Sequence, residues 1–455
     1  MPANNASLYM SPVAQNERQL PRSYWAATAG PQVKLDRLQG AAEADVAVVG
    51  GGFVGLRAAL ELSLKGTSVI VIDSEEPGYG ASGRSGGQIN PLPHILPDEV
   101  VKEYGSHHAE IFFAMMPRLA DEVFDVIRTH GIDCENYQHG WIQAAHKPSK
   151  MRLLEARQKG WSRHGIDVEM VSRQEVMQKV GAPGYYGGAF FRRGGALHPM
   201  AFTRGLAHAV IKAGGRIFSK TSAESLARTN GRWQVSCNGG AAVISCENVV
   251  IATNGYTGRQ PIPGLKRSIL SVPTVLAASE PLSDEQLKII MPGWTTLADT
   301  RRALFYTRRT GTNRIMLGGS AHNHFEVRDF ERHRIDVGLR HVFPQLAGLK
   351  WDYCWSGIVA LTADHLCHFH EPMPGVFVGL GFNGRGVAIT TMMGRTLAER
   401  VLGAGPRTLP FPTMPMKIDP YALFGHLGLR IGTSYYETLD AVDNWRNRDM
   451  LKTNA

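Results

Sequence analysis

The stretch between residues 44 and 88 constrains the fold of this 455-residue chain more strongly than any other. An apolar run at residues 44–49 leads directly into a G-x-G-x-x-G motif at residues 50–55, and a second apolar run at residues 69–72 is followed by an acid. This order predicts a strand, a tight glycine turn, a helix and a parallel second strand. Such a unit binds dinucleotides, whereas a glycine turn with a purely structural purpose needs neither the second strand nor the acid.

Each glycine of the motif has a distinct expected role. Gly50 permits the tight turn, Gly52 lets the backbone approach a pyrophosphate, and Gly55 allows the helix to pack closely on the strand. The start of the helix supplies unpaired N–H groups for the phosphates. Asp73 lies 23 residues after Gly50, where a carboxylate accepts hydrogen bonds from a ribose diol. The predicted contacts of this unit also include Phe53, Val54 and Ser74.

The segment that follows, GYGASGRSGGQ at residues 78–88, is too rich in glycine for a helix or a strand, so its backbone is free to wrap a ligand. The whole unit resembles the FAD-binding N-terminus of the D-amino-acid-oxidase superfamily, which includes glycine and sarcosine oxidases. In that superfamily a GASGRxGG segment runs along the pyrophosphate and the ribityl chain. The resemblance implies FAD as cofactor and contacts from Gly80, Ala81, Ser82, Arg84, Ser85, Gly86, Gly87 and Gln88.

Composition excludes several classes of protein. With 43% apolar and 20% charged residues, the chain is neither disordered nor fibrous, and no apolar run approaches the ~20 residues of a membrane helix. The N-terminus lacks the apolar core of a secretory signal, and the five cysteines show no C-x-x-C spacing. We therefore expect a reduced, cytoplasmic protein. The net charge of +9 is diffuse, which indicates a solvated basic surface and no nucleic-acid site.

Further motifs resemble the same superfamily in the same order. A Ser-Tyr-Trp-Ala-Ala-Thr stretch at residues 23–28 resembles γ-glutamylputrescine-oxidase-like members, and we interpret it as an aromatic staple on the surface. The turn of Ala252, Thr253 and Asn254 resembles a wall beneath the adenosine. A second glycine turn opens a helix whose N-terminus stabilises negative charge on a flavin ring. The residues expected at the ring are Gly384, Arg385, Gly386 and Val387.

The resemblance implies an α/β fold, in which a Rossmann-like FAD-binding domain of the glutathione-reductase type carries an inserted antiparallel-sheet substrate domain. Strand patterns at residues 271–278, 303–307 and 314–319 suit the substrate sheet. The patterns at residues 215–218, 233–237 and 241–245 suit a side sheet of the FAD-binding domain.

The domains are predicted to alternate along the chain. A helix is expected over residues 98–130, where apolar side chains recur at three- and four-residue spacing. The FAD-binding domain is assigned to residues 41–95, 193–262 and 353–405, the substrate domain to residues 96–192 and 263–352, and a C-terminal tail to residues 406–455.

His365, His368 and His370, with Asp364 and Cys367 beside them, are residue types that bind zinc. We interpret them differently, because a strand directs alternate side chains to opposite faces, and no metal is expected. In some sarcosine-oxidase-type relatives a cysteine attaches FAD covalently. The corresponding strand at residues 303–307 contains no cysteine, so non-covalent FAD is expected.

The resemblance implies removal of a hydride from the carbon next to an amine, followed by hydrolysis of the imine. Oxygen, which would yield hydrogen peroxide, or another acceptor then reoxidises the flavin. The expected substrate is an amine or amino acid of the γ-glutamylputrescine type. Alternatives are an oxidase of L-pipecolate-like or proline-like imino acids, a membrane-associated dehydrogenase that feeds quinone, and an RNA-modifying flavoenzyme. The basic balance and the tail at residues 409–455 motivate the peripheral membrane alternative.

The substrate is further expected to carry a carboxylate, which in a partly dry pocket needs a cation. Arg385 lies in the glycine turn at the flavin, and Arg308 follows a strand of the substrate sheet, on the face opposite to Arg309. Tyr256 and Tyr306 are expected to complete the pocket.

Overall fold

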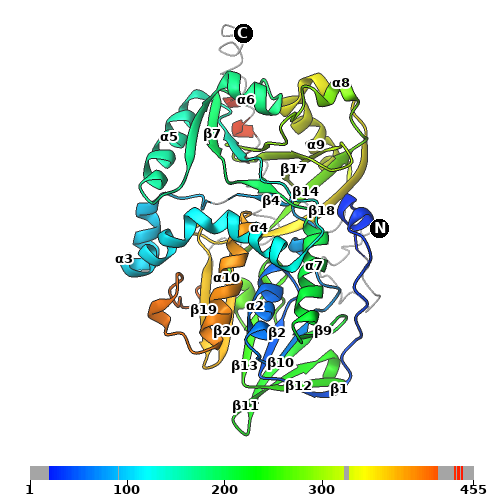
Figure 1. Ribbon diagram of the computed structural model, residues 1–455, viewed down its shortest axis with the longest axis vertical. Coiled ribbons are helices and arrows are strands. Elements are labelled where there is room, and N and C mark those ends of the chain that lie inside the picture. Colours follow the sequence, from blue (N-terminus) through cyan, green and yellow to red (C-terminus); the bar gives the residue numbers. More distant parts are fainter. Residues whose placement is uncertain are drawn as a thin grey trace, which may run out of the picture.

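The computed structural model describes residues 20–90, 92–321, 327–418, 435–436, 438–440 and 442–443. Two sheets of different type divide the molecule into halves (Figure 1). A six-stranded sheet with the helices α2 and α10 occupies the lower half, and an eight-stranded sheet occupies the upper half. The fold is therefore the predicted α/β fold with a nucleotide-binding domain and an antiparallel-sheet domain.

The six-stranded sheet is the Rossmann-like core. Its order is β19-β20-β13-β2-β3-β9, and every neighbouring pair is parallel except β19 with β20. All residues of β2 and β3 are buried, because helices or a second sheet cover both faces, and this explains their unbroken apolar sequences. The strands are β2 (Val46–Val49), β3 (Val69–Ile72), β9 (Arg216–Phe218), β13 (Asn248–Ile251), β19 (His368–Met373) and β20 (Val376–Leu380).

Three helices pack together on this sheet. Helix α2 (Phe53–Leu64) contacts both α10 (Gly386–Val401) and α7 (Pro199–Lys212). Helix α7 connects to β9, which pairs with β3 in the parallel sheet. The prediction that residues 215–218 belong to the side sheet is therefore wrong, because β9 pairs with β3 of the parallel sheet.

The side sheet itself is present at the base of the molecule (Figure 1). It confirms the predicted strands at residues 233–237 and 241–245 and adds two strands that the sequence analysis did not assign. Its members are β1 (Gly40–Glu43), β10 (Ala223–Thr229), β11 (Arg232–Cys237) and β12 (Ala242–Cys246).

The eight-stranded sheet has the order β18-β14-β17-β16-β15-β5-β7-β6 and is antiparallel except where β15 pairs with β5. Its longest pair joins β14 to β18 from Leu270 and Leu361 to Ser279 and Trp351, so residues 353–361 pair within this sheet although the predicted boundary places them in the FAD-binding domain. The boundaries themselves stay predictions. The strands are β5 (Trp141–Ala144), β6 (Val168–Ser172), β7 (Gly187–Phe191), β14 (Leu270–Ser279), β15 (Thr296–Asp299), β16 (Phe305–Arg309), β17 (Ile315–Ser320) and β18 (Trp351–Leu361).

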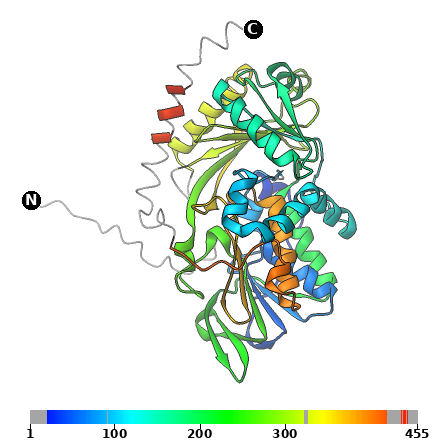
Figure 2. The same cartoon turned by 90° about the vertical axis from the view of Figure 1, so that its left-hand side faces the viewer.

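Two helices lie between the halves, as the side view shows (Figure 2). The predicted helix over residues 98–130 is interrupted twice. Within α3 (Pro97–Met115), Gly105 is non-helical with a φ of 76°, and a 3₁₀ turn that contains Pro117 separates α3 from α4 (Leu119–His130), because proline cannot donate a helical hydrogen bond. A separate short antiparallel pair joins β4 (Gln88–Ile89) to β8 (Gly195–Ala196). The other helices are α1 (Tyr24–Thr28), α5 (Pro148–Ser162), α6 (Arg173–Val180), α8 (Asp284–Leu287) and α9 (Asp329–Val342).

Short pieces of the C-terminal segment lie beside the upper half (Figure 2), where Asp440 forms an ion pair with Arg302. The apolar stretch at residues 421–429, which the sequence analysis considered for membrane contact, lies outside the described residues. Among the helices that the structure describes, none has the length and apolar character needed to span a bilayer.

Candidate active site

The predicted nucleotide turn has the geometry that requires glycine. Gly50 has a φ of 111°, and a Cβ there would lie 2.8 Å from the carbonyl oxygen of Ala252. At Gly55 a Cβ would lie 2.0 Å from the carbonyl oxygen of Gly50, so the helix could not pack against the turn. Gly52 is the N-cap of α2, and a Cβ there would lie 2.9 Å from Ser82 Oγ. The three glycines thus keep side chains away from the start of α2.

Asp73 reaches this turn from the end of β3. Its Oδ2 accepts a hydrogen bond from the Gly51 N–H at 2.7 Å, and its Oδ1 accepts one from the Glu75 N–H at 2.9 Å. Loss of surrounding water raises the pKa of Asp73 to about 6, although both N–H groups oppose that rise. A carboxylate beside the glycine turn stands where the sequence predicted the ribose ligand. Ser74 next to it is exposed.

The glycine-rich loop, residues 78–88, is attached to the start of α2. The Phe53 N–H donates to Ser82 Oγ at 3.0 Å, in a short 3₁₀ turn that begins at Ala81. Arg84 closes the loop on itself, because its Nε donates to the Tyr79 carbonyl at 2.6 Å and its Nη1 donates to the Ser356 carbonyl at 3.2 Å. The loop therefore has a defined shape in the protein alone.

Two tryptophans from distant segments hold the backbone of this loop. Trp25 Nε1 donates to the Ser85 carbonyl and Trp355 Nε1 to the Arg84 carbonyl, both at 2.9 Å. Trp25 has no exposed surface and Tyr24 is 1% exposed, so the interpretation of residues 23–28 as a surface staple is wrong. The segment lies under the loop because β14, β17 and β18 supply an apolar face for its rings.

The end of the loop enters the substrate sheet. The ring of Tyr306 packs against Gly86, where a Cβ would lie 2.8 Å from ring carbon Cε2. A Cβ at Gly87 would lie 2.1 Å from the Leu197 carbonyl oxygen. Gln88 donates through Nε2 to the carbonyls of Leu297 and Thr307, and its Oε1 accepts from the Trp141 indole at 3.1 Å.

The two other predicted turns lie at the same edge of the parallel sheet. They follow β13, which is next to β2, and β20, which is next to β13, and all three strands are parallel. Ala252 and Thr253 follow β13 and border the Gly50 turn, and Asn254 Oδ1 accepts from the Gly381 N–H at 3.0 Å. Gly384 has a φ of 74°, and α10 begins two residues later at Gly386, with Val387 buried in its first turn. All three turns therefore lie at one edge of the parallel sheet.

Arg308 does not fit the predicted role of a substrate arginine. Its side chain has no exposed surface, and its Nη2 pairs with Glu135 Oε1 at 2.7 Å. Its Nη1 donates to the Leu197 carbonyl at 2.5 Å, and its guanidinium lies between the rings of Trp25 and Tyr137. The charge of Arg308 is already paired, and its hydrogen bonds tie β16 to Glu135 and Leu197.

The two tyrosines also differ from each other in position. Tyr256 packs on Gly80 in the glycine-rich loop, where a Cβ would lie 3.2 Å from the tyrosine ring. Tyr256 therefore supports the loop. Tyr306 lies on the face of β16 that contacts the glycine-rich loop. Burial alone raises the pKa of its hydroxyl. Of the pair, Tyr306 is the better candidate for contact with a substrate.

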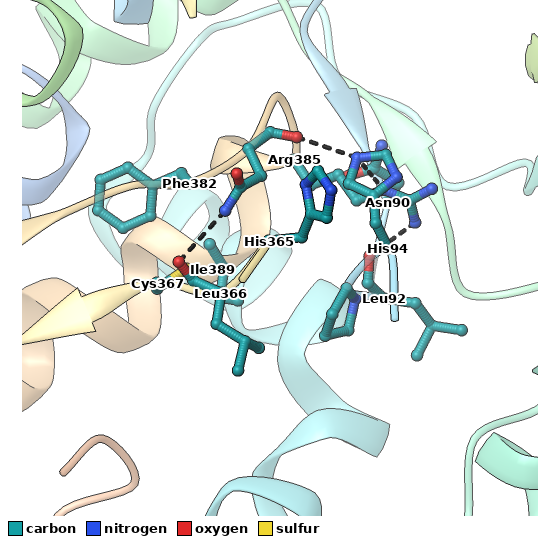
Figure 3. Close-up of a pocket in the computed structure, with 11 residues that line it drawn as sticks. Asn90, Leu92, His94, His365, Leu366, Cys367, Phe382, Arg385 and Ile389 are labelled. Carbon is teal, nitrogen blue, oxygen red and sulfur yellow. Dashed lines mark hydrogen bonds between the residues drawn. The ribbon is translucent and has the colours of Figure 1, made fainter. Parts of the chain in front are cut away.

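Arg385 lines a pocket between the start of α10 and residues 92–94, here called the Arg385 pocket (Figure 3). Its Nη1 donates to the Leu92 carbonyl at 2.6 Å, and its Nε donates to His94 Nε2 at 3.1 Å. Asn90 and His94 also line this pocket, and sequence analysis missed both. The only available signal was their place just after the glycine-rich loop.

The histidine group predicted to be structural has protein partners. His368 Nε2 contacts Asp364 Oδ2 at 2.8 Å, and His370 Nδ1 contacts the Met414 carbonyl at 2.7 Å. Within the described residues, His146, Asp440 and Asp443 also lie within metal-binding distance of one another. Arg302 and Lys147 already neutralise these two carboxylates, so we assign no metal there.

The glycine cradle, the open start of α2 and the acid beside it fit FAD. A family model described as FAD dependent oxidoreductase matches residues 45–400. The chain belongs to this family and is an FAD-dependent oxidoreductase.

Individual proteins resemble the chain over nearly its full length. It is 32% identical to the probable oxidoreductase OrdL of Haemophilus influenzae, with 92% of this chain and 97% of that protein covered. It is 30% identical to the γ-glutamylputrescine oxidoreductase of Escherichia coli, with 92% and 98% covered. The crystal structure of glycine oxidase from Geobacillus kaustophilus has the same fold, with a TM-score of 0.67, 21% identity, and 83% and 99% of the two chains covered.

Proposed function

We propose that the protein oxidises a C–N bond in a small amine or amino acid of the γ-glutamylputrescine type. The observation that carries this proposal is the similarity over 92% of the chain to a γ-glutamylputrescine oxidoreductase, together with a pocket at the flavin end of α10. FAD, when bound, accepts a hydride from the carbon next to the amine. The resulting imine is then hydrolysed to a carbonyl compound, with release of ammonia from a primary amine or of an amine from a secondary one.

The protein's own residues would bind and orient the cofactor. Gly50, Gly52, Gly55 and the N–H groups at the start of α2 would receive the pyrophosphate, and Asp73 would accept from the ribose diol. The glycine-rich loop would follow the ribityl chain, and the turns at residues 252–254 and 384–387 would border the adenosine and the ring.

The flavin is proposed to be non-covalent. Cys367 is the cysteine in the Arg385 pocket, and burial raises the pKa of its thiol, so a nucleophilic thiolate is disfavoured there. Trichloroacetic acid should therefore release all the flavin into the supernatant, whereas a yellow pellet would contradict this part of the proposal.

The decisive experiment is anaerobic bleaching of the flavin with a panel of amines, amino acids and imino acids. We expect γ-glutamylputrescine or a close analogue to bleach it, and air to restore the colour with one hydrogen peroxide per substrate. Rapid bleaching by proline or pipecolate alone would favour an imino-acid oxidase. Bleaching without peroxide in air would favour a different electron acceptor.

A further inference from the structure

Helix α1 has only five residues, and helices shorter than about 12 residues are marginal in water by themselves. Contacts with other segments therefore fix its position. Tyr24 Oη lies 3.0 Å from Thr312 Oγ1, in the turn between β16 and β17 of the eight-stranded sheet. The Trp25 indole donates to the Ser85 carbonyl of the glycine-rich loop. The helix thus joins the loop to the eight-stranded sheet.

The third contact of α1 is with His198, a buried histidine at the start of α7. The Ala201 N–H donates to His198 Nδ1 at 3.1 Å, so this nitrogen carries no proton. Burial, and then the charge of Arg308, lower the pKa of His198 to about 3, and the neutral ring holds its proton on Nε2. Nε2 donates to Thr28 Oγ1 at 3.0 Å, and that hydroxyl donates to the Tyr24 carbonyl at 2.7 Å. The ring of His198 therefore has one tautomer and one orientation.

His198 also contacts the side chain that reaches the loop. Its imidazole lies edge-on to the Trp25 indole, with 4.6 Å between the ring centroids and 63° between the ring planes. Trp355 packs on the same indole at 6.1 Å, and the Arg308 guanidinium lies 5.3 Å from the indole centroid. Trp25 has no exposed surface, so these neighbours restrict its rotation and hold its Nε1–H against the Ser85 carbonyl.

The carbonyl that Trp25 binds belongs to the peptide between Ser85 and Gly86. This peptide is trans, so its C=O and N–H groups point in opposite directions, and the Gly86 N–H points away from α1. Gly86 is buried, but its N–H has no hydrogen-bond partner among the described residues. Because buried N–H groups are nearly always paired, this donor is expected to find its acceptor in a ligand that runs along the loop.

We propose that α1 is a latch that holds the glycine-rich loop in the shape that binds FAD, and that His198 is the residue that positions this latch. His198 acts through Trp25. It fixes the indole, the indole fixes the Ser85 carbonyl, and the Gly86 N–H is then available to an oxygen atom of FAD. Such a latch would act in the same way whichever amine the enzyme oxidises.

Substitutions at Thr28 and His198 test the latch. Thr28 is exposed, so its replacement disturbs little packing. Thr28→Val removes the hydroxyl that His198 binds, and Thr28→Ser keeps it. His198→Asn keeps an acceptor for the Ala201 N–H at the start of α7, but its side chain is too short to reach Thr28. Thr229→Val, at an exposed threonine of β10 in the side sheet, is the matched control.

Quenching of flavin fluorescence on binding to the apoproteins gives the Kd of each variant for FAD. We expect Thr28→Val and His198→Asn each to raise this Kd about threefold, whereas Thr28→Ser and Thr229→Val leave it unchanged. In a Trp25→Phe background neither Thr28→Val nor His198→Asn should raise the Kd further, because both act through the indole. Additive losses in that background, or an unchanged Kd in either single variant, would overturn the proposal.

Amide hydrogen exchange separates a latch from a contact that only stabilises α7. In the apoproteins, residues 84–88 should exchange faster in Thr28→Val and His198→Asn than in wild type, while exchange in α7 after its first turn stays unchanged. In wild type, FAD should slow exchange at Gly86, where the N–H gains an acceptor. Faster exchange confined to α7, or no slowing at Gly86 on FAD binding, would contradict the latch.

Discussion

The glycine-rich loop and the Arg385 pocket lie next to each other, but their polar groups are satisfied in opposite ways. In the loop, Arg84 bonds to two carbonyls, two indoles hold the backbone, and Gln88 makes three hydrogen bonds. In the pocket, Asn90 Oδ1 and Arg385 Nη2 have no partner in the described chain. The polar side chains of the loop are thus satisfied within the protein, whereas the pocket keeps polar atoms without a partner among the described residues.

The largest expected effect concerns the cradle next to the loop. Gly52→Val should give a folded but colourless protein, because the side chain would occupy the space of the pyrophosphate. Gly293→Val is the control, since no atom lies within 4 Å of a Cβ there. Absorbance of the purified proteins and circular dichroism measure cofactor and fold. A yellow Gly52→Val with full FAD would refute the placement of the phosphates.

A substitution in the buried pair of Arg308 and Glu135 tests whether Arg308 contributes to stability or to substrate binding. Arg308→Met should reduce the free energy of unfolding by about 3–5 kcal/mol, because it leaves Glu135 partly buried without its partner. Urea unfolding of the apoprotein measures this. Arg309→Met, on the opposite face over the Trp294 ring, should cost less than about 1 kcal/mol. A strongly raised KM in Arg308→Met at unchanged stability would instead restore the substrate role.

Asp73 predicts a pH dependence of cofactor binding. Its pKa in the apoprotein is about 6, above the ordinary 3.8, and a ribose diol requires the ionised form. FAD binding should therefore release a proton below pH 6. The affinity for FAD should be constant above pH 6 and should decrease below it by up to about tenfold per pH unit.

The raised pKa of Asp73 also predicts how the stability of the apoprotein depends on pH. The native state holds this proton more tightly than the unfolded state does, so stability should decrease as pH rises from about 4 to 6. Asp73→Asn should remove both dependences. Titrations by flavin fluorescence at several pH values measure the pH dependence of FAD binding, and equal FAD affinity at pH 5 and pH 7 would contradict that prediction.

The smallest expected effect comes from a single hydrogen bond to the loop. Trp25→Phe removes the donor to the Ser85 carbonyl and should weaken FAD binding about fivefold, equivalent to about 1 kcal/mol. Trp233→Phe removes the indole hydrogen bond from β11 of the side sheet to the Pro374 carbonyl between β19 and β20, and it should leave FAD affinity unchanged. Equal FAD affinities in the two variants would show that the loop keeps its shape without Trp25.

Local sequence predicted the nucleotide-binding unit well, because its geometry follows from adjacent residues. Gly50, Gly52 and Gly55 are separated by one and two residues, and backbone sterics alone require glycine at the tight turn and at the close approach. The strands at residues 233–237 and 241–245 were assigned for the same reason, since alternation within a strand is local. The strand at residues 216–218 was misassigned because sheet membership depends on its partner β3.

Sequence therefore determined the fold family, the cofactor and the turns that receive it. Only the tertiary structure decided which arginine is paired and which is not. Strand alternation placed Arg308 on one face of β16, but Glu135 and Trp25, which are far away in the chain, determine what that face meets. Likewise, Arg157 from α5 and Arg385 from the turn before α10 converge on the carbonyls of Pro93 and Leu92. The charge balance of a buried site is a sum over such distant neighbours, so no local pattern contains it.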